Sequence, residues 1–338
     1  MRRGRTPAGR IGNPAPSKLS GWVIVLPGWG ERCRALLADR VIPAVLHALH
    51  FADQGATLLI YSDVEFRLPE LPAGVTAQFH PVPGPDFAFE SLSNCHRDAL
   101  TLIEPAARIM LLTADMVVSR EVFATCNTHF NVGRRLICCI APRTRQEVLP
   151  PIGATGRDLG AWAWEHRHRM TRECTWPDGH SFDIWRMYFE REGEVAAHAF
   201  LPHPLAAMPG GRHVAFRPTI DVNFAASFSA GETYLISDPA EGVIIEQSPD
   251  DKDFVMTTTM AERLASPALA SCPQFVPCAN PRHLAFFMTR VVLVGAGGDC
   301  GDGEVVARIS SPTPRPRPRM SMVRRDFHRP GRRGRGLQ

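Results

Sequence analysis

The chain has 338 residues, of which 44% are hydrophobic and 21% are charged. This composition is typical of a soluble globular protein and excludes a collagen, a coiled coil and a wholly disordered chain. The formal net charge of +4 is unevenly distributed, because residues 1–18 carry +5 and residues 306–338 carry +9, which leaves −10 on residues 19–305.

The first 145 residues alternate between apolar runs and helical patterns. Apolar runs bounded by turn residues predict buried strands at 21–27, 57–63, 75–82, 108–115 and 135–141. Apolar residues at every third or fourth position predict helices between them, the first containing Leu37, Val41, Val45 and Leu49. Pro43 should kink or divide that first helix. Further helices are expected from Ser91 and, as a short one, from Ser119.

Buried strands without alternation, separated by helices, predict a parallel sheet that is covered on both faces. The expected fold class is therefore α/β, with a Rossmann-type, mostly parallel central sheet. Ligands of such sheets bind outside the carboxyl ends of the strands. Those ends carry Pro27, Gly28, Trp29 and Gly30 after the first strand, Asp63 after the second and Asp115 after the fourth.

The second half of the chain has a weaker pattern and is expected to be mixed. A helical stretch rich in Trp and His is predicted at 157–176, and strands are predicted at 182–189 and 195–207. A strand pair is expected at 234–237 and 243–247, and a last strand or helix at 284–294. The Trp and His side chains of the helical stretch could stack on a sugar, although packing in the core is the commoner role of such residues.

Asp115 lies directly after a buried strand, within Met110-Leu-Leu-Thr-Ala-Asp-Met-Val-Val-Ser119. A carboxylate in this place can reach the ligand side of the sheet and hold Mg²⁺ or Mn²⁺, which neutralises a leaving diphosphate. An aspartate at a strand end can equally cap the following turn. The residues alone leave both interpretations open.

Four of these segments occur in an order that resembles a known family. The first strand, the Tyr-Ser-Asp63 strand end, the Asn94-Cys-His-Arg-Asp-Ala-Leu100 helix and the hydrophobic-Thr-Ala-Asp115 element resemble the nucleotide-binding half of GT-A-fold glycosyltransferases. Ala199-Phe-Leu-Pro-His-Pro-Leu205 and Phe216-Arg-Pro-Thr-Ile-Asp221 resemble the second half of a little-characterised bacterial group of GT-A-like proteins. The resemblance covers roughly residues 20–250.

The resemblance implies a glycosyltransferase that moves a sugar from a nucleotide-sugar donor to an unidentified acceptor. The GT-A-like domain would occupy 19–255, with a nucleotide-binding half at 19–145 and an acceptor half at 146–255. A less defined extension would follow at 256–305, and disordered basic segments would lie at 1–18 and 306–338. In this layout the Gly28–Gly30 loop would cover the nucleotide, and Asp63 would lie near its base or ribose.

The resemblance also implies a metal site. In the family an Asp-x-Asp motif binds the metal and the donor, but Thr113 stands here in place of the first acid. Mn²⁺ or Mg²⁺ would then rely on Asp115, with His203 as a further ligand or as a contact to the diphosphate. Alternatively, His203 has only a structural role and makes its hydrogen bonds within a turn before Pro204.

Two aspartates are candidates for the catalytic base. Asp221 follows Thr219 and Ile220 and could deprotonate an acceptor hydroxyl, although it could also cap the segment 222–228. Asp183, near Trp185, is the second candidate.

Two alternatives to an enzyme remain at this stage. The loss of the first acid is compatible with a GT-A-like domain that binds a nucleotide sugar without turning it over. The arginine-rich ends could instead bind nucleic acid or another polyanion, although the acidic body would oppose this. Nine cysteines without a Cys-x-x-Cys motif and the lack of an apolar run of about 20 residues predict a cytoplasmic protein without a membrane span.

We predict that residues 1–18 and 306–338 are dispensable for folding, because their composition cannot bury apolar area. A fragment of residues 19–305 should keep its melting temperature within a few degrees and lose any retention on heparin. A collapse of stability after trimming would place the domain edge elsewhere.

Overall fold

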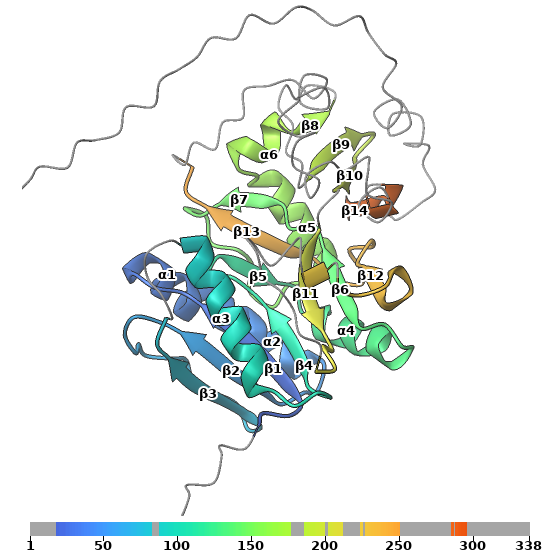
Figure 1. Ribbon diagram of the computed structural model, residues 1–338. Helices are drawn as coiled ribbons and strands as arrows, with labels where there is room; N and C mark the ends of the chain where they lie inside the picture. Colours follow the sequence, from blue (N-terminus) through green and yellow to red (C-terminus); the bar gives the residue numbers. More distant parts are fainter. Residues whose placement is uncertain are drawn as a thin grey trace, which may run out of the picture. The chain divides into compact units, whose positions relative to one another are not determined.

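The computed structural model describes residues 18–82, 88–176, 186–199, 202–211, 224–225, 227–250, 285–286 and 288–295. Apart from Lys18, both predicted basic tails lie outside the described residues. What the structure describes is an α/β arrangement around a large central sheet (Figure 1).

The central sheet has seven strands. In spatial order they are β12 (Thr233–Leu235), β6 (Leu136–Cys139), β11 (His203–Ala207), β4 (Arg108–Leu111), β1 (Trp22–Pro27), β2 (Ala56–Tyr61) and β3 (Val75–His80). Within this described sheet β11 alone runs antiparallel to its neighbours, and the other pairings are parallel. The expected α/β class with a mostly parallel sheet is therefore confirmed.

Helices lie on both faces of the central sheet, as expected (Figure 1). One face packs against α2 (Ile42–Phe51) and α4 (Val122–Asn131), and the other packs against α3 (Ala88–Leu102). All six residues of β1 are buried. Because strand side chains alternate, Ile24 joins the apolar cluster beneath α2, whereas Val25 joins the cluster beneath α3.

The helical region after β1 contains a π-helical segment. It begins with α1 (Glu31–Leu36), continues as a π-helix at Leu37–Val41 and ends with α2. Pro43 lies in the first turn of α2, directly after the π-helical segment, and the helical residues run without a break from Glu31 to Phe51. The chain therefore passes Pro43 with a widened turn just before it instead of a break. Such widened turns are frequent at functional sites.

Two smaller sheets complete the described fold. One has the order β14 (Val291–Val294), β10 (Glu194–His198), β9 (Met187–Arg191) and β8 (Thr175–Trp176). The other consists of β5 (Met116–Val118), β13 (Ile244–Ser248) and β7 (Arg143–Arg145), with β13 in the middle. The helices α5 (Gly156–Glu165) and α6 (Arg169–Glu173) and a 3₁₀ turn at Ala230–Glu232 are the remaining elements.

Three expectations for the second half are wrong. The helix expected at 157–176 ends at Glu165 and restarts at Arg169, because His168 adopts an extended backbone and caps α6. The strand expected at 195–207 is two strands, β10 and β11, that belong to different sheets. The strands at 234–237 and 243–247 do not pair with each other, since β12 joins β6 and β13 joins β5 and β7.

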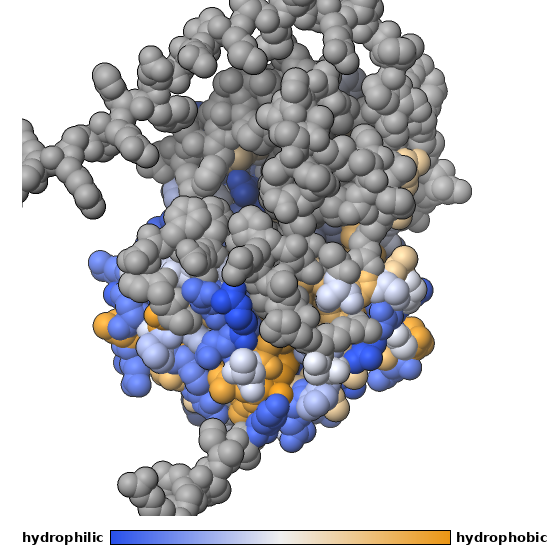
Figure 2. All heavy atoms as spheres, viewed as in Figure 1, coloured by the Kyte–Doolittle hydropathy of each residue, from blue (hydrophilic) through white to orange (hydrophobic). Residues whose placement is uncertain are grey.

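The described surface is mainly hydrophilic in the view of Figure 2, with smaller apolar areas between the charged ones. Among the residues that the structure describes, no helix has the length and apolar character needed to cross a membrane.

Gly160 tests how tightly α5 packs on the last strand. A Cβ atom there would overlap the backbone carbonyl oxygen of Leu293 in β14. Alanine normally favours a helix over glycine by about 1 kcal/mol, yet Gly160→Ala should lower the free energy of unfolding by about 2 kcal/mol in urea titrations, because β14 must move. A Cβ at Gly231 would have no atom within 4 Å, so Gly231→Ala should change stability by less than about 0.5 kcal/mol. A stabilised Gly160→Ala would disprove this packing.

Candidate functional site

Six strands of the central sheet end at one edge, which we call the carboxyl edge. They are β1, β2, β3, β4, β6 and β12, and the reversed strand β11 begins there. Strand order changes direction between β1 and β4, because β2 and β3 lie on one side of β1 and β4 lies on the other. In open α/β sheets this switch point is where ligands bind.

The loop after β1 closes against the loop after β4 at this switch point. Pro27 and Gly28 are buried, and Trp29 is half-buried. The Gly28 N–H donates to the carbonyl of Tyr61 at 2.9 Å. A Cβ on Gly28 would meet the side chain of Leu37 and the Cβ of Ala114, the latter at 3.1 Å. Glycine therefore allows the two loops to touch.

Asp63 joins the same edge from the end of β2. Both carboxylate oxygens accept from Arg34 Nη1, at 2.6 and 2.7 Å, and from the Gly30 N–H, at 3.3 Å. The Arg34 guanidinium holds the pKa of Asp63 below its ordinary value. Gly30 has φ 77° and ψ 155°, a backbone region that is essentially restricted to glycine. The structure thus brings the Gly28–Gly30 loop and Asp63 together.

Asp115 is partly buried in the turn between β4 and β5. The Thr113 hydroxyl donates to Oδ1 of Asp115 at 2.5 Å, and the carbonyl of Asp115 accepts from the Gln247 N–H at 2.8 Å. Burial raises the pKa of the Asp115 carboxyl, and the neighbouring Glu246 raises it further. Thr113, which replaces the first acid of the family motif, is therefore a hydrogen-bond donor to the remaining acid.

A charged cluster next to Asp115 was not predicted from the sequence. The carboxylate of Glu246 in β13 is held by Arg143 Nε at 3.0 Å and by Arg186 Nη2 at 2.7 Å. All three side chains are less than one-fifth exposed. Burial alone would raise the pKa of Glu246, but the charges and hydrogen bonds of Arg186 and Arg143 outweigh it and lower the pKa to about 2.

Successive residues of β13 are tied to different parts of the molecule. Gln247, which is fully buried, accepts from Arg40 Nη1 at 2.9 Å, and Arg40 also donates to the carbonyl of Gln146 at 2.7 Å. Arg40 lies in the π-helical segment. The helix that follows the Gly28–Gly30 loop is thereby connected to the strand that carries Glu246.

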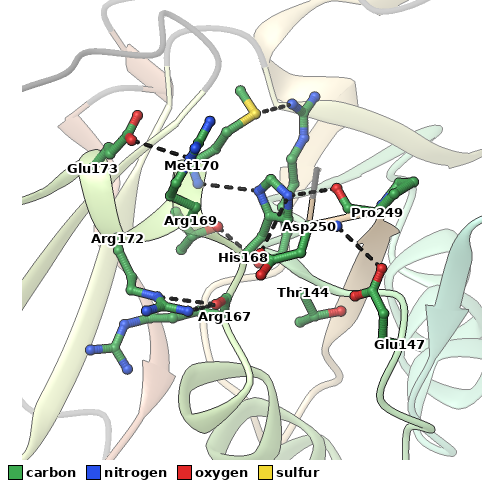
Figure 3. A network of polar contacts seen from close by, with 12 residues as sticks. Thr144, Glu147, Arg167, His168, Arg169, Met170, Arg172, Glu173, Pro249 and Asp250 are labelled. Carbon is green, nitrogen blue, oxygen red and sulfur yellow. Dashed lines mark hydrogen bonds and ion pairs between the residues drawn. The ribbon is translucent and has the colours of Figure 1, made fainter. Parts of the chain in front are cut away.

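His168 lies between Met170 and Pro249 (Figure 3), and its contacts fix the ends of the strands that carry Arg143 and Glu246. Its Nδ1 accepts from the Met170 N–H at 3.2 Å, so Nε2 carries the proton that is donated to the carbonyl of Pro249 at 2.9 Å. The His168 N–H and the Thr171 hydroxyl both donate to the carbonyl of Arg143, each at 2.9 Å. His168 is fully buried and has a structural role here.

The aromatic residues of the same stretch also make internal contacts. Trp164 is buried, its Nε1 donates to Glu190 at 3.0 Å, and the Arg167 guanidinium lies 4.4 Å from the centre of its ring. Trp162 lies against His166 with ring centres 4.8 Å apart. Core packing therefore describes Trp164 and His168 better than stacking on a sugar.

His203 begins β11 at the carboxyl edge. Its Nε2 donates to the carbonyl of Leu111 at 3.0 Å. His96 of α3 is fully buried nearby, and burial together with the neighbouring His203 lowers the pKa of His96 to about 3. Asp98, two residues after His96 in α3, accepts a hydrogen bond from the Tyr61 hydroxyl at 2.8 Å. The helix singled out in the sequence thus secures β2 and faces His203.

The described residues do not fit the expected Mn²⁺ or Mg²⁺ site. Within the described ranges, no three His, Cys, Asp or Glu side chains are grouped so that they could share an ion. One oxygen of Asp115 is taken by the Thr113 hydroxyl, Nε2 of His203 is taken by Leu111, and the positive charge of Arg143 acts on Asp115.

Both candidate catalytic bases, Asp183 and Asp221, lie outside the described residues. Their role as the base that deprotonates an acceptor stays a prediction.

No protein-family model and no curated protein matches the chain. Similar solved structures include S. aureus TarS 1–349 (TM-score 0.26, 9% identity, 39% of this chain and 38% of that chain). For the complex of TarS 1–349 with UDP, the TM-score is 0.26 and the identity 7%, over 39% of this chain and 38% of that chain. For the complex with UDP-GlcNAc, the TM-score is 0.25 and the identity 8%, over 39% of this chain and 37% of that chain. The chain thus matches less than two-fifths of the length of these structures.

Glu246 should stabilise the protein through its ionised form. Glu246→Gln removes the charge partner of two largely buried arginines and should lower the free energy of unfolding by about 3 kcal/mol at pH 7. Because the folded pKa of about 2 lies below the usual 4.5, the stabilisation is complete above pH 4.5 and is lost as the pH falls through about 2. Urea titrations between pH 7 and pH 2 should therefore show the two proteins converging.

Glu192→Gln is a suitable control, because Glu192 is 86% exposed and its nearest cation is 3.8 Å away. It should change stability by less than about 1 kcal/mol at any pH. A difference between wild type and Glu246→Gln that does not vary with pH would mean that packing, and not charge, is the source of the effect.

Proposed function

We propose that this protein binds a nucleotide sugar at the carboxyl edge and transfers its glycosyl group to an acceptor. The observation that supports this best is the convergence of the Gly28–Gly30 loop, Asp63 and the Thr113–Asp115 turn at the switch point between β1 and β4. A carboxylate at the end of the second strand is the group that accepts ribose hydroxyls in nucleotide-binding α/β sheets. Asp63 has that position and is about half exposed.

The same geometry disfavours a dinucleotide of the NAD type. In that class the glycine loop and the helix after it present N–H groups to the pyrophosphate. Here the N–H of Gly30 already donates to the Asp63 carboxylate, which would repel a phosphate group. The loop also lacks the full Gly-x-Gly-x-x-Gly spacing. The nucleoside end of a ligand fits this side of the edge, and its phosphates belong elsewhere.

Transfer needs an acceptor oxygen to attack the anomeric carbon of the donor. The bond from that carbon to the diphosphate oxygen breaks, and the nucleoside diphosphate leaves with the electron pair. The proton of the acceptor hydroxyl passes to a carboxylate base, for which Asp221 is the first candidate and Asp183 the second. Asp115, at the switch point, would contact the donor sugar.

Binding without turnover is the second candidate. It is favoured by one observation, which is that Thr113 replaces an acid and donates to Asp115. Release of free nucleoside diphosphate from a bound donor distinguishes the two, since a binding domain would leave the donor intact.

A thermal-shift screen of UDP-, GDP-, CMP- and dTDP-sugars tests the proposal. A ligand at 100 times its dissociation constant stabilises the folded state by about 2.7 kcal/mol, so at least one class of donor should raise the melting temperature clearly. Asp63→Asn should weaken that donor about tenfold, because a hydroxyl bonded to a charged acceptor loses its partner.

Asp39→Asn is the matched control, since Asp39 is exposed on the π-helical segment and its change should leave the affinity unaltered. A screen in which no donor shifts the melting temperature would rule out the proposed function. Equal donor affinities of wild type and Asp63→Asn would remove Asp63 from the nucleotide site.

A further inference from the structure

We propose that the guanidinium groups of Arg143 and Arg186 bind the diphosphate of the donor and take the place of a divalent cation. This inference rests on the proposed function and names the group that meets the phosphates. It follows from where the two arginines lie along the carboxyl edge and from how they are held.

The position of Arg143 relative to Asp63 and Asp115 supports this proposal. Arg143 begins β7, four residues after β6 ends at the carboxyl edge, and its partner Glu246 is a neighbour of Asp115, which follows β4. From β2, which carries Asp63, to β4, which Asp115 follows, there are two inter-strand spacings of about 4.8 Å, or about 10 Å. A nucleotide sugar with its nucleoside at Asp63 would extend across the switch point toward Arg143. Asp115, after β4, lies beside the arginine cluster, next to where the sugar that follows the diphosphate would lie.

The distribution of charged side chains along the carboxyl edge also supports it. Two guanidinium groups contact one carboxylate, that of Glu246, and the neighbouring acid is Asp115. At the other end of the edge the half-exposed Asp63 carboxylate accepts from the Gly30 N–H and is paired with a single guanidinium group, that of Arg34, at 2.6 Å. The carboxyl edge thus has an acid where a hydroxyl-bearing nucleoside fits and a pair of arginines where an anion fits.

Both guanidinium groups are held in place by other residues. The carbonyl of Arg143 is held by the His168 N–H and the Thr171 hydroxyl, and both guanidinium groups are fixed by Glu246. Groups that are fixed before the reaction stabilise a developing charge at no reorganisation cost. The planar donor arrangement of arginine also matches phosphate oxygens with two parallel hydrogen bonds.

The divalent cation that these arginines would replace is disfavoured at Asp115. A divalent ion at Asp115 would find the neighbouring Glu246 carboxylate already held by two arginines, would compete with the Thr113 hydroxyl and would be repelled by Arg143. The positive charge of Arg143, which would repel a cation, would attract a diphosphate. The replacement of the first acid by Thr113 and the arginine pair are thus consistent with one another.

The test is calorimetric titration of the full-length protein with UDP, GDP, CDP and dTDP, in excess EDTA and again in Mn²⁺. We expect one of them to bind with the same dissociation constant in both conditions. Arg143→Gln and Arg186→Gln should each weaken it about tenfold or more, since a charge-assisted hydrogen bond is lost. Inorganic pyrophosphate should compete with the bound nucleotide for the wild type, and each Gln variant should weaken that competition.

Arg120→Gln is the matched control. Arg120 pairs with Glu121 at 3.1 Å and lies over Phe51, which is the last residue of α2. Its change should leave nucleotide affinity unaltered. If a Gln variant does not unfold cooperatively, Arg143→Lys and Arg186→Lys keep a positive charge beside Glu246 and should still weaken binding about threefold or more, because an ammonium group cannot donate the two parallel bonds.

The possible failures are distinguishable. A wild-type protein that binds none of the four diphosphates and none of the nucleotide sugars disproves the proposed function, and the inference with it. Binding that requires Mn²⁺, or binding that the arginine variants leave unchanged, overturns the inference while the proposed function stands.

Discussion

The complete burial of β1 is the constraint on which the rest of the structure depends. A strand that is covered on both faces and bonded to parallel neighbours at both edges has no freedom in where it ends. The residues that follow it must therefore emerge beside those that follow β2 and β4. The absence of a side chain at Gly28 then lets Leu37 and Ala114 close over the turn. The contact between three loops that are distant in sequence is a result of this one strand.

The small sheet of β5, β13 and β7 connects this edge to the second half of the chain. Its central strand, β13, links Asp115, Arg40 and Arg186 through the side chains of Glu246 and Gln247 and the backbone amide of Gln247. These partners come from the turn after β4, from the π-helical segment and from the start of β9. Charged groups that are this well enclosed require partners of opposite sign, and Glu246 provides one for both arginines.

Much of the first half could be predicted because parallel, buried strands have a simple signature. Apolar runs identified β1, β2, β3, β4 and β6, and the strand-end rule placed Gly28, Asp63 and Asp115 on one edge. The strands β5 and β7 have three residues each, and Arg-Thr-Arg at 143–145 has no apolar pattern. Their pairing with β13 depends on residues about 100 positions away, which local sequence does not encode.

The arginine cluster was missed for a related reason. Its three members come from three separate segments, and none of them belongs to a recognisable motif. One signal was nevertheless present, since Glu246 interrupts the apolar run from Val243 to Ile245. A charged residue inside a buried strand indicates a cation nearby, although the sequence does not say which of the 38 lysines and arginines supplies it.

The adjacent pair Glu246–Gln247 has a consequence for how β13 finds its place. Strand side chains alternate between the two faces, so a shift of one residue exchanges the faces of the whole strand. A shift in one direction would put the neutral amide of Gln247 between the two arginines, and a shift in the other direction would put the apolar side chain of Ile245 there. In either case the arginine pair would lose its countercharge. The polar residues of β13 thus act as an electrostatic check on strand register, which its apolar residues, Ile244 and Ile245, could not supply because they are interchangeable.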